Sequence, residues 1–428
     1  MTKKVLIICD LFPPAFGPRM GYLCKYLPQS GWESMVVTEK IDDHTFTFLS
    51  EEIGSNDYVY VDYYPAKTEK GKKRQWFYTF ILDFLFGYKD RKMLKMVRQY
   101  VRNNKVDLVL CSTYRTFPLT VALKAAKERN LPLVVDLRDI IEQYPKNEFI
   151  THRLPHYWGL DKLITAIFKR KNLQIRNKVL IRADYVTTVS PWHVDALKPY
   201  NSNIDLIYNG YDPALFYAEQ IKTKQFIITY TGRIYSTAMR DPSLFFEALK
   251  KMQQEGLITS DTCRVHWYVD ETSWQFIEKE AEKTGVIAFM ENKGYVPASQ
   301  IPTILNHSSV LLLLTNKATD NGPKGILTTK FFESLAVEKP ILCVRSDESL
   351  LADMLHETKG GLAARNVDEV VAFLLHYYRE WQKNGFTKSL VDKEILRLYS
   401  RETQAGQFAT LFDRLTEENR FKEVKETR

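Results

Sequence analysis

The chain opens with MTKKVLIICDLFPPAFGPRMGYLCKYLPQSGWESMVVT, residues 1–38, and this stretch decides the fold class. A short apolar run at Val5–Cys9 predicts a buried strand, Met20–Gln29 has the spacing of an amphipathic helix, and Ser34–Thr38 predicts a second strand. Two short apolar strands separated by a helix are typical of a parallel sheet that helices cover on both faces. We therefore expect an α/β protein.

The same alternation continues along the whole chain of 428 residues. Further strands are predicted at Val106–Cys111, Leu133–Leu137, Tyr185–Val189, Phe226–Tyr230, Arg264–Val269, Val310–Leu314 and Ile341–Val344. Helices are predicted at Thr116–Arg129, Pro242–Gln254, Trp274–Lys283, Thr329–Val337, Val367–Lys383 and Thr403–Thr416. A chain of this length fits two domains of about 200 residues better than one large sheet.

The boundary between the two domains is predicted near residue 209. Turn signals at Asn209–Gly210 and Asp212–Pro213 precede a polar stretch at Ala218–Lys224. We expect a doubly wound, Rossmann-like domain over residues 1–208, a second one over residues 209–402, and a C-terminal helix and tail over residues 403–428. We expect that helix to pack back on the first domain.

Composition narrows the class of protein. Hydrophobic residues make up 45% of the chain and charged residues 26%, which is usual for a globular protein. The five cysteines form no CxxC pair, which indicates a reduced, cytoplasmic protein. The run Val5–Cys9 is too short for a signal peptide, and no stretch approaches the roughly 20 apolar residues of a membrane span.

The loop DLFPPAFGPRMG, Asp10–Gly21, follows the first predicted strand. Ligands of doubly wound sheets bind beyond the carboxyl ends of the strands, so this loop is a candidate binding element. Gly17 would let backbone approach a ligand, and Arg19 would point a guanidinium toward it. A plain turn explains the loop equally well. The loop lacks the GxGxxG pattern, which disfavours a nicotinamide dehydrogenase.

The stretch YTGRIYSTAMR, Tyr230–Arg240, follows the first predicted strand of the second domain. Thr231 and Gly232 would bring backbone to the crevice, and Arg233 would supply a bidentate cation there. Such a cation suits a diphosphate leaving group, whose charge grows as its bond to a sugar breaks. Arg240 is a candidate for a second positive charge, although an ordinary surface arginine is an equally good explanation for it.

The stretch NGPKGILTTKFFE, Asn321–Glu333, places glycines such as Gly325 before a helix that we expect to begin at Thr329. A helix N-terminus binds anions through its free amides and its dipole. Lys330 and Glu333 share one helix face, so the lysine can meet phosphate while the glutamate accepts hydrogen bonds from ribose hydroxyls. The alternative is a surface ion pair without a function.

Taken in chain order, several stretches resemble the family 4 glycosyltransferases, particularly the branch that builds bacterial surface and capsular polysaccharides. They are FPPAFGPR at 12–19, GWESMVVT at 31–38, VVDLRD at 134–139, ADYVTTVS at 183–190, IYNGYDPALF at 207–216, TGRIY at 231–235 and TKFFESLAVEKPIL at 329–342. No single stretch is specific, and the resemblance rests on their order over most of the chain.

The resemblance implies the GT-B fold, in which two Rossmann-like domains face a cleft. It implies that the second domain binds a nucleotide-diphosphate sugar and the first binds the acceptor. It further implies a retaining hexosyltransferase that needs neither a metal ion nor a cofactor. The motif residues that carry over are Gly17 for approach to the donor, Arg233 and Lys330 for the phosphates, and Glu333 for the ribose.

The chain departs from the family pattern at several positions. Gly325 stands where many members have a second glutamate, and Ala238 stands where many have a lysine. In place of a histidine near the sugar, the stretch VVDLRD offers Asp136, Arg138 and Asp139. The candidate catalytic residues are Arg233, Lys330 and Asp139. The candidate substrate-binding residues are Gly17, Arg19, Arg138, Thr231, Gly232, Arg240, Gly325, Thr329 and Glu333.

The chain has a net charge of +8, and the first domain contains two basic stretches, Lys67–Lys105 and Lys162–Arg182. They lead to the hypothesis that the protein binds peripherally to a membrane. The aromatic run Trp76–Tyr88 is too short to span a bilayer but suits the headgroup region. A helix buried against its own sheet is the alternative for this run. On this hypothesis the domain meets a lipid-linked or polysaccharide acceptor at the cytoplasmic face of the membrane. No nucleic-acid-binding module is recognisable.

Rival functions for the same fold remain open at this point. A non-catalytic protein that binds a sugar nucleotide or a partner would explain the missing glutamate at Gly325. A sugar epimerase would need a pair of acid and base side chains at the sugar, which the sequence does not reveal. No DxD motif ends a predicted strand, which disfavours the metal-dependent single-domain transferases.

Overall fold

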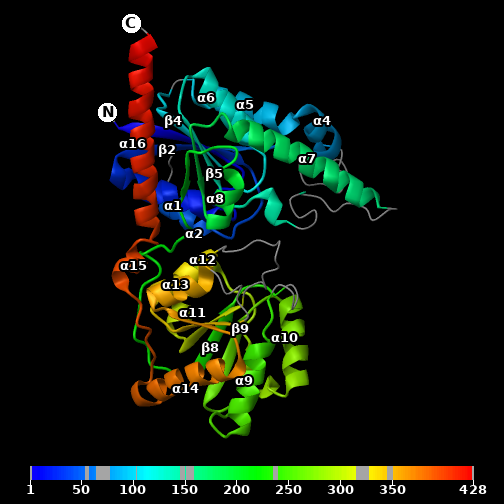
Figure 1. Cartoon of the computed structure of the whole chain (residues 1–428), viewed down its shortest axis with the longest axis vertical. Helices are drawn as coiled ribbons and strands as arrows, with labels where there is room; N and C mark the ends of the chain where they lie inside the picture. The colour runs from blue at the N-terminus through cyan, green and yellow to red at the C-terminus, as the bar shows by residue number, and fades with distance from the viewer. Residues whose placement is uncertain are drawn as a thin grey trace. The chain divides into compact units, whose positions relative to one another are not determined.

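The computed structural model describes residues 2–53, 57–63, 78–102, 104–144, 150, 159–234, 240–314, 327–344 and 350–426 (Figure 1). The chain folds into two compact units. The first unit contains Met1–Tyr208 together with Glu402–Arg428, and the second contains Asn209–Arg401. Each unit is built on one parallel sheet, which confirms the predicted α/β class with two doubly wound domains.

The sheet of the first unit has seven strands in the order β3-β2-β1-β4-β5-β6-β7. The strands are β1 (Lys3–Cys9), β2 (Trp32–Glu39), β3 (Tyr58–Val61), β4 (Leu108–Thr113), β5 (Leu133–Leu137), β6 (Tyr185–Thr188) and β7 (Ile204–Leu206). In β1, Ile7 pairs in parallel register with Val36 of β2 and with Leu110 of β4. The strand order reverses between β1 and β4, and ligands of such sheets bind at the carboxyl ends near this point.

Helices cover both faces of this sheet. They are α1 (Pro18–Tyr26), α2 (Thr47–Ile53), α4 (Phe84–Phe86), α5 (Tyr88–Tyr100), α6 (Leu119–Glu128), α7 (Leu160–Leu180), α8 (Pro191–Leu197) and α16 (Arg401–Glu426). Short 3-10 or π-helical turns lie at Leu27–Ser30, Tyr78–Asp83 and Ile141–Gln143. Leu6 and Ile8 of β1 enter one hydrophobic core, and Val5, Ile7 and Cys9 enter the other. Because Val5–Cys9 of β1 is buried on both faces, this run must be apolar, which makes it readable from the sequence.

The aromatic run predicted at Trp76–Tyr88 is divided among several elements. The π-helical turn Tyr78–Asp83 leads into the single turn α4, and Gly87 then has a left-handed backbone with a φ of 59°. The next helix, α5, begins at Tyr88. Residues 64–77 lie outside the described residues, so the start of the run is not part of this description.

The C-terminal helix α16 packs on the first unit, as expected. Phe412 is fully buried and meets Trp32 of β2 edge-on, with the ring centroids 5.3 Å apart. Asp413 accepts hydrogen bonds from Lys3 Nζ at 2.6 Å and from Trp32 Nε1 at 3.1 Å. In Figure 1 the helix, drawn in red, runs beside β2. The end of the chain therefore completes a core around its beginning.

The sheet of the second unit has six parallel strands in the order β10-β9-β8-β11-β12-β13. The strands are β8 (Phe226–Thr231), β9 (Cys263–Tyr268), β10 (Met290–Asn292), β11 (Val310–Leu314), β12 (Ile341–Val344) and β13 (Gly361–Ala364). The helices are α9 (Ser243–Gln254), α10 (Glu271–Thr284), α11 (Ile301–Asn306), α12 (Thr329–Ala336), α13 (Leu350–Thr358), α14 (Val367–Asn384) and α15 (Lys393–Arg397), with 3-10 turns at Ile287–Phe289 and Ala298–Gln300. The order reverses between β8 and β11, so β8 holds the position that β1 holds in the first unit.

Candidate functional site

Gly17, in the loop between β1 and α1, lies against the backbone of its own loop. A Cβ atom at Gly17 would lie 2.6 Å from the Leu11 carbonyl carbon and from the Phe12 amide nitrogen. The Gly17 N–H donates to the Ala15 carbonyl at 2.7 Å. The loop therefore needs glycine here for its own fold, and a role for Gly17 in ligand binding stays a prediction.

Arg19 differs from the expectation, because its guanidinium lies inside the first unit. Its side chain is 3% exposed, and that of its partner Asp136 on β5 is 0% exposed. Arg19 Nε and Nη2 donate to the two Asp136 carboxylate oxygens at 3.0 and 2.9 Å. The same guanidinium donates to the carbonyl oxygens of Ile207 and Tyr208, both at 2.9 Å. These bonds occupy Arg19 within the fold, and its assignment as a substrate ligand stays a prediction.

Asp136 is the centre of this buried network. Ser112 Oγ on β4 and Thr187 Oγ1 on β6 each donate to its carboxylate at 2.8 Å. Burial opposes the negative charge, but Arg19 and the two hydroxyls outweigh it and hold the pKa of Asp136 below its usual value. The network ties α1 to three neighbouring strands, and its role is structural.

A polar cluster lies at the carboxyl ends of β1, β4 and β5. Arg138 Nη2 donates to one oxygen of Asp10 at 3.0 Å, and Thr113 Oγ1 donates to the other at 2.9 Å. Burial raises the pKa of Asp10, and Arg138 and Arg115 act against that rise. The sequence analysis named Arg138 but missed Asp10 and Thr113. Their positions as polar residues directly at the ends of buried strands are the signal that points to them.

Asp139 follows Arg138 and is held by Gln143. Gln143 Nε2 donates to Asp139 Oδ1 at 2.8 Å, and His193 Nε2 on α8 lies 3.0 Å from Gln143 Oε1. Burial raises the pKa of Asp139, while the bond from Gln143 and the charge of Arg138 lower it. Gln143 and His193 were not identified from the sequence, because neither stands in a recognisable motif. The catalytic role of Asp139 stays a prediction.

In the second unit, cationic side chains gather around the backbone of Gly232. Gly232 directly follows β8 and has a φ of 136°, a conformation that favours glycine. Lys330 Nζ donates to the Thr231 carbonyl at 2.9 Å, and a Cβ atom at Gly232 would lie 2.0 Å from that nitrogen. Arg240 Nη1 donates to the carbonyl of Arg233. The structure thus brings Thr231, Gly232, Arg240 and Lys330 together.

Arg233 itself points partly into solvent. Its side chain is 59% exposed, and its Nε lies 3.1 Å from the Asp270 carboxylate. A half-exposed arginine held by one exposed carboxylate can turn to a stronger anion without loss of a buried contact. The geometry leaves Arg233 available for a ligand, and its catalytic role stays a prediction.

Lys330 and Glu333 stand one turn apart on α12, and the pKa values of both side chains are shifted. Burial, followed by the charges of Arg240 and Arg233, lowers the pKa of Lys330 to about 8. Burial raises the pKa of Glu333 to about 7, against the opposing effect of Arg401 and Lys330. Buried, perturbed groups of this kind are common at functional sites. Thr329 is the first residue of α12, whereas Gly325 and Ala238 lie outside the described residues.

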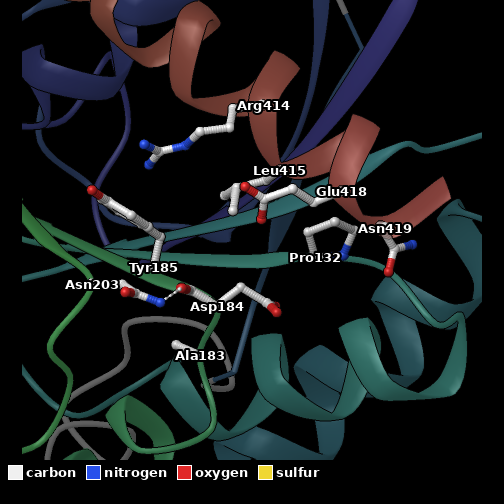
Figure 2. Close-up of a pocket in the computed structure, with 9 residues that line it drawn as sticks. All are labelled: Pro132, Ala183, Asp184, Tyr185, Asn203, Arg414, Leu415, Glu418 and Asn419. Carbon is white, nitrogen blue, oxygen red and sulfur yellow. Dashed lines mark hydrogen bonds between the residues drawn. The ribbon is translucent and has the colours of Figure 1, made fainter. Parts of the chain in front are cut away.

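A cavity of about 490 Å³ lies in the first unit between α16 and the amino ends of β5, β6 and β7 (Figure 2). Its lining residues are Pro132, Ala183, Asp184, Tyr185, Asn203, Arg414, Leu415, Glu418 and Asn419. In Figure 2 the Asn203 amide reaches the Asp184 carbonyl, at 3.2 Å. None of the predicted site residues lines this cavity. It lies at the strand ends opposite to those where ligands of doubly wound sheets bind.

A metal-binding cluster and a membrane-spanning helix are both absent from the residues that the structure describes. No group of three or more His, Cys, Asp or Glu side chains in that part of the chain is placed to hold a metal ion. No helix built from those residues is long and apolar enough to cross a membrane.

Comparison with solved structures defines the class of protein. HepE from Anabaena, solved with UDP and glucose, is 15% identical, with a TM-score of 0.62 and coverage of 96% of this chain and 99% of that chain. Sucrose-phosphate synthase from Thermosynechococcus elongatus is 14% identical, with a TM-score of 0.63 and the same coverage. A mutant of TarM from S. aureus, solved with UDP, is 10% identical, with a TM-score of 0.59 and again this coverage. The TM-scores establish the shared fold, which is GT-B.

A family model matches part of the sequence. Residues 19–215 match the sequence profile of Glycosyltransferase Family 4, which confirms the resemblance predicted from the motifs. None of the curated proteins compared with this chain matches it. The protein is therefore a glycosyltransferase of the GT-B type, similar to family 4.

We predict that Arg19→Met destabilises the first unit by about 3–5 kcal/mol, because it leaves the Asp136 charge buried without its partner. Denaturant unfolding followed by a probe in the first unit measures the loss. The matched control is Arg129→Met, since Arg129 is exposed. Equal stability of the two variants would contradict a structural role for Arg19.

For the second unit we predict that Lys330→Met raises stability at neutral pH. The pKa of Lys330 in the folded protein, about 8, lies below that of an unfolded lysine, so its charge is destabilising below pH 8. This destabilisation disappears as the pH rises from about 8 to about 10.4, because Lys330 is then neutral in both the folded and the unfolded protein. Thermal unfolding across this range measures it, with the exposed Lys250→Met as control. A Lys330→Met protein that unfolds more easily at pH 7 would contradict the prediction.

Proposed function

We propose that this protein transfers a sugar from a nucleotide-diphosphate sugar to a lipid-linked or glycan acceptor, with retention of configuration and without a metal ion. The observation that carries the proposal is the cluster around Gly232. There the half-buried Lys330 and Arg240 lie beside the backbone of Gly232, and a half-buried glutamate stands one helical turn from Lys330. In the first unit, Asp139 and Arg138 are proposed to act on the acceptor, and Gly17 to let the donor approach the backbone.

The cluster suits the two ends of a nucleoside diphosphate. Lys330, Arg233 and Arg240 supply positive charge for the diphosphate, and the glycine at 232 lets Lys330 Nζ approach the chain, since a Cβ atom there would lie 2.0 Å from that nitrogen. The carboxylate of Glu333 can accept two hydrogen bonds from the cis-diol of a ribose. The solved structures of HepE with UDP-glucose and of TarM with UDP support this class of donor, since those proteins share the fold.

The same charges support transfer without a metal ion. Sugar transfer develops negative charge on the leaving diphosphate, and a divalent cation or fixed basic side chains can neutralise it. Arg233, Arg240 and Lys330 place such side chains beside Gly232. We propose front-face transfer, in which the bond from the anomeric carbon to the diphosphate oxygen breaks as the acceptor hydroxyl attacks from the same side. The departing phosphate oxygen then takes the hydroxyl proton.

We also propose that the first unit rests on the cytoplasmic face of a membrane. Leu85 and Phe86 of α4 are each 59% exposed, and Leu163 and Ile167 of α7 are 57% and 49% exposed. The two helices meet where Phe84 stacks on Phe168 with ring centroids 4.0 Å apart. Every charged residue from Lys162 to Arg182 is basic. Exposed apolar side chains beside a basic helix fit an anionic lipid surface.

The donor site is tested by calorimetry with UDP, GDP, ADP and CMP in buffer that contains a chelator. We expect one nucleotide to bind selectively, and Glu333→Ala to weaken that binding about tenfold or more, because ribose hydroxyls lose a charged acceptor. Glu357→Ala, at an exposed position of α13, is the matched control. If none of the four nucleotides binds, or if both variants bind like wild type, the proposed donor site is wrong.

Binding of the selected nucleotide should also depend on pH in two directions. Below pH 7, Glu333 is protonated and no longer accepts hydrogen bonds freely; above pH 8, Lys330 loses its charge. We therefore expect the highest affinity between these values. Calorimetry from about pH 6 to about pH 9 measures the profile, and Glu333→Gln should remove its acid limb. A flat profile for the wild type would contradict this assignment.

Membrane binding is tested by flotation with vesicles of phosphatidylcholine alone or mixed with phosphatidylglycerol. We expect binding to the mixed vesicles at low salt, loss of binding at high salt, and weaker binding for Phe86→Asp and Leu163→Asp. Ile181→Asp is the control, since Ile181 is 63% exposed just beyond the end of α7. Failure of the wild type to float at low salt would refute the membrane proposal.

A further inference from the structure

A chain of side-chain hydrogen bonds runs through the first unit and ends on the Asp139 carboxylate. Thr188 Oγ1 at the end of β6 lies 3.0 Å from His193 Nδ1, and His193 Nε2 lies 3.0 Å from Gln143 Oε1. Gln143 Nε2 then donates to Asp139 Oδ1 at 2.8 Å. Thr188 and His193 are fully buried. The chain connects β6 and α8 to the segment that follows β5.

The orientation of the Gln143 amide group follows from its contact with the backbone N–H of Ile140. The Ile140 N–H lies 3.3 Å from Gln143 Oε1, and only an oxygen can accept that hydrogen bond. The amide nitrogen of Gln143 therefore faces Asp139. Burial lowers the pKa of His193 to about 4, so its ring is neutral and carries a single N–H. With that proton on Nε2 the ring donates to Gln143, and Nδ1 lies beside the Thr188 hydroxyl, which also lies 2.9 Å from the Leu137 carbonyl.

The segment that carries Gln143 is fixed from a second helix as well. Arg176 of α7 is 1% exposed and donates to both carboxylate oxygens of Glu142, at 2.6 and 2.7 Å. Glu142 and Gln143 are neighbours in the 3-10 turn Ile141–Gln143. This turn is thus held by α7 through an ion pair and by α8 through a hydrogen bond. Little freedom is left for the Gln143 amide to turn away from Asp139.

We infer that Gln143 is a positioning residue for Asp139, which it holds ionised and in one orientation, and that His193 fixes the orientation of the Gln143 amide. The inference rests on the proposed function, in which Asp139 acts on the acceptor side of the site. An amide nitrogen can only donate, so it favours the ionised carboxylate over the protonated acid. Among the residues that the structure describes, none donates a hydrogen bond to the second oxygen of Asp139, which leaves that oxygen for an acceptor hydroxyl.

The other charges around Asp139 act in both directions. Arg138 lowers its pKa, whereas Asp10 and burial raise it. Tyr144, close to Asp139, Arg115 and Arg138, has its own pKa raised by burial and by the Asp139 charge. Glu142 and Arg176 face His193 with opposite effects on the ring. Because burial works against the charge of Asp139, the hydrogen bond from Gln143 is the contact whose loss shifts the balance toward the neutral acid.

The test is the titration of Asp139 by carbon NMR of protein labelled at aspartate, with the Asp139 signal assigned from Asp139→Asn. Gln143→Leu removes the donor, and we expect the pKa of Asp139 to rise by about one unit or more. Gln143→Glu keeps the shape and the acceptor for Ile140 and His193 but adds a second carboxylate, so a larger rise is expected. Gln99→Leu, at an exposed position of α5, is the matched control and should leave the titration unchanged.

The outcomes separate this inference from the proposed function. An Asp139 titration that is the same in Gln143→Glu and wild type would overturn the positioning role, whatever the activity of the protein. His193→Gln offers a second variant in case Gln143→Leu does not fold, and it should produce a smaller rise in the same direction. If nucleotide binding fails while the titration shifts as expected, the donor assignment is wrong and the hydrogen-bonded chain stands. Where transfer is measurable, the acid limb of kcat/KM should move to higher pH in Gln143→Glu.

Discussion

The ion pair between Arg19 and Asp136 is the interaction on which the first unit depends. It joins the start of α1 to the middle of the sheet, and it also binds the carbonyl groups of Ile207 and Tyr208 at the end of the first chain segment. A buried charge of this kind persists only when its partner and its remaining hydrogen-bonding groups are satisfied. Ser112 and Thr187 complete the carboxylate, so the position of the β1 loop is set by side chains from β4, β5 and β6.

The second unit follows the opposite principle. Lys330 and Glu333 are half-buried, and Lys330 lies near the like charges of Arg240 and Arg233. Partial burial and these charges move their pKa values toward neutrality. Such an arrangement opposes folding, and it is understandable when a bound anion supplies the missing countercharge. The contrast separates the two kinds of buried charge in this protein. A complete network stabilises the first unit, whereas the partly buried charges of the second unit suit the proposed binding site.

Both units place their reactive groups at the carboxyl ends of parallel strands. In the first unit Asp10, Thr113 and Arg138 stand at the ends of three neighbouring strands, and in the second Thr231 and Gly232 stand at the end of β8. Most side chains along strands that are buried on both faces are apolar, with the Asp136 network as an exception, and further polar groups gather at the strand ends. The aromatic and basic surface of α4 and α7 lies outside this scheme and belongs to the exterior of the first unit.

The sequence by itself determined the α/β class and the two sheets, and it indicated the stretches of the proposed donor site. Buried parallel strands must be short apolar runs, and glycine must stand where backbone adopts a positive φ, as at Gly232. Only the tertiary structure decided which polar groups meet. Arg19 and Asp136 are 117 positions apart, Arg138 and Asp10 are 128 apart, and His193 and Gln143 are 50 apart. Local pattern carries no information about such pairs, because the folding of the sheet, and not the spacing along the chain, brings their side chains together.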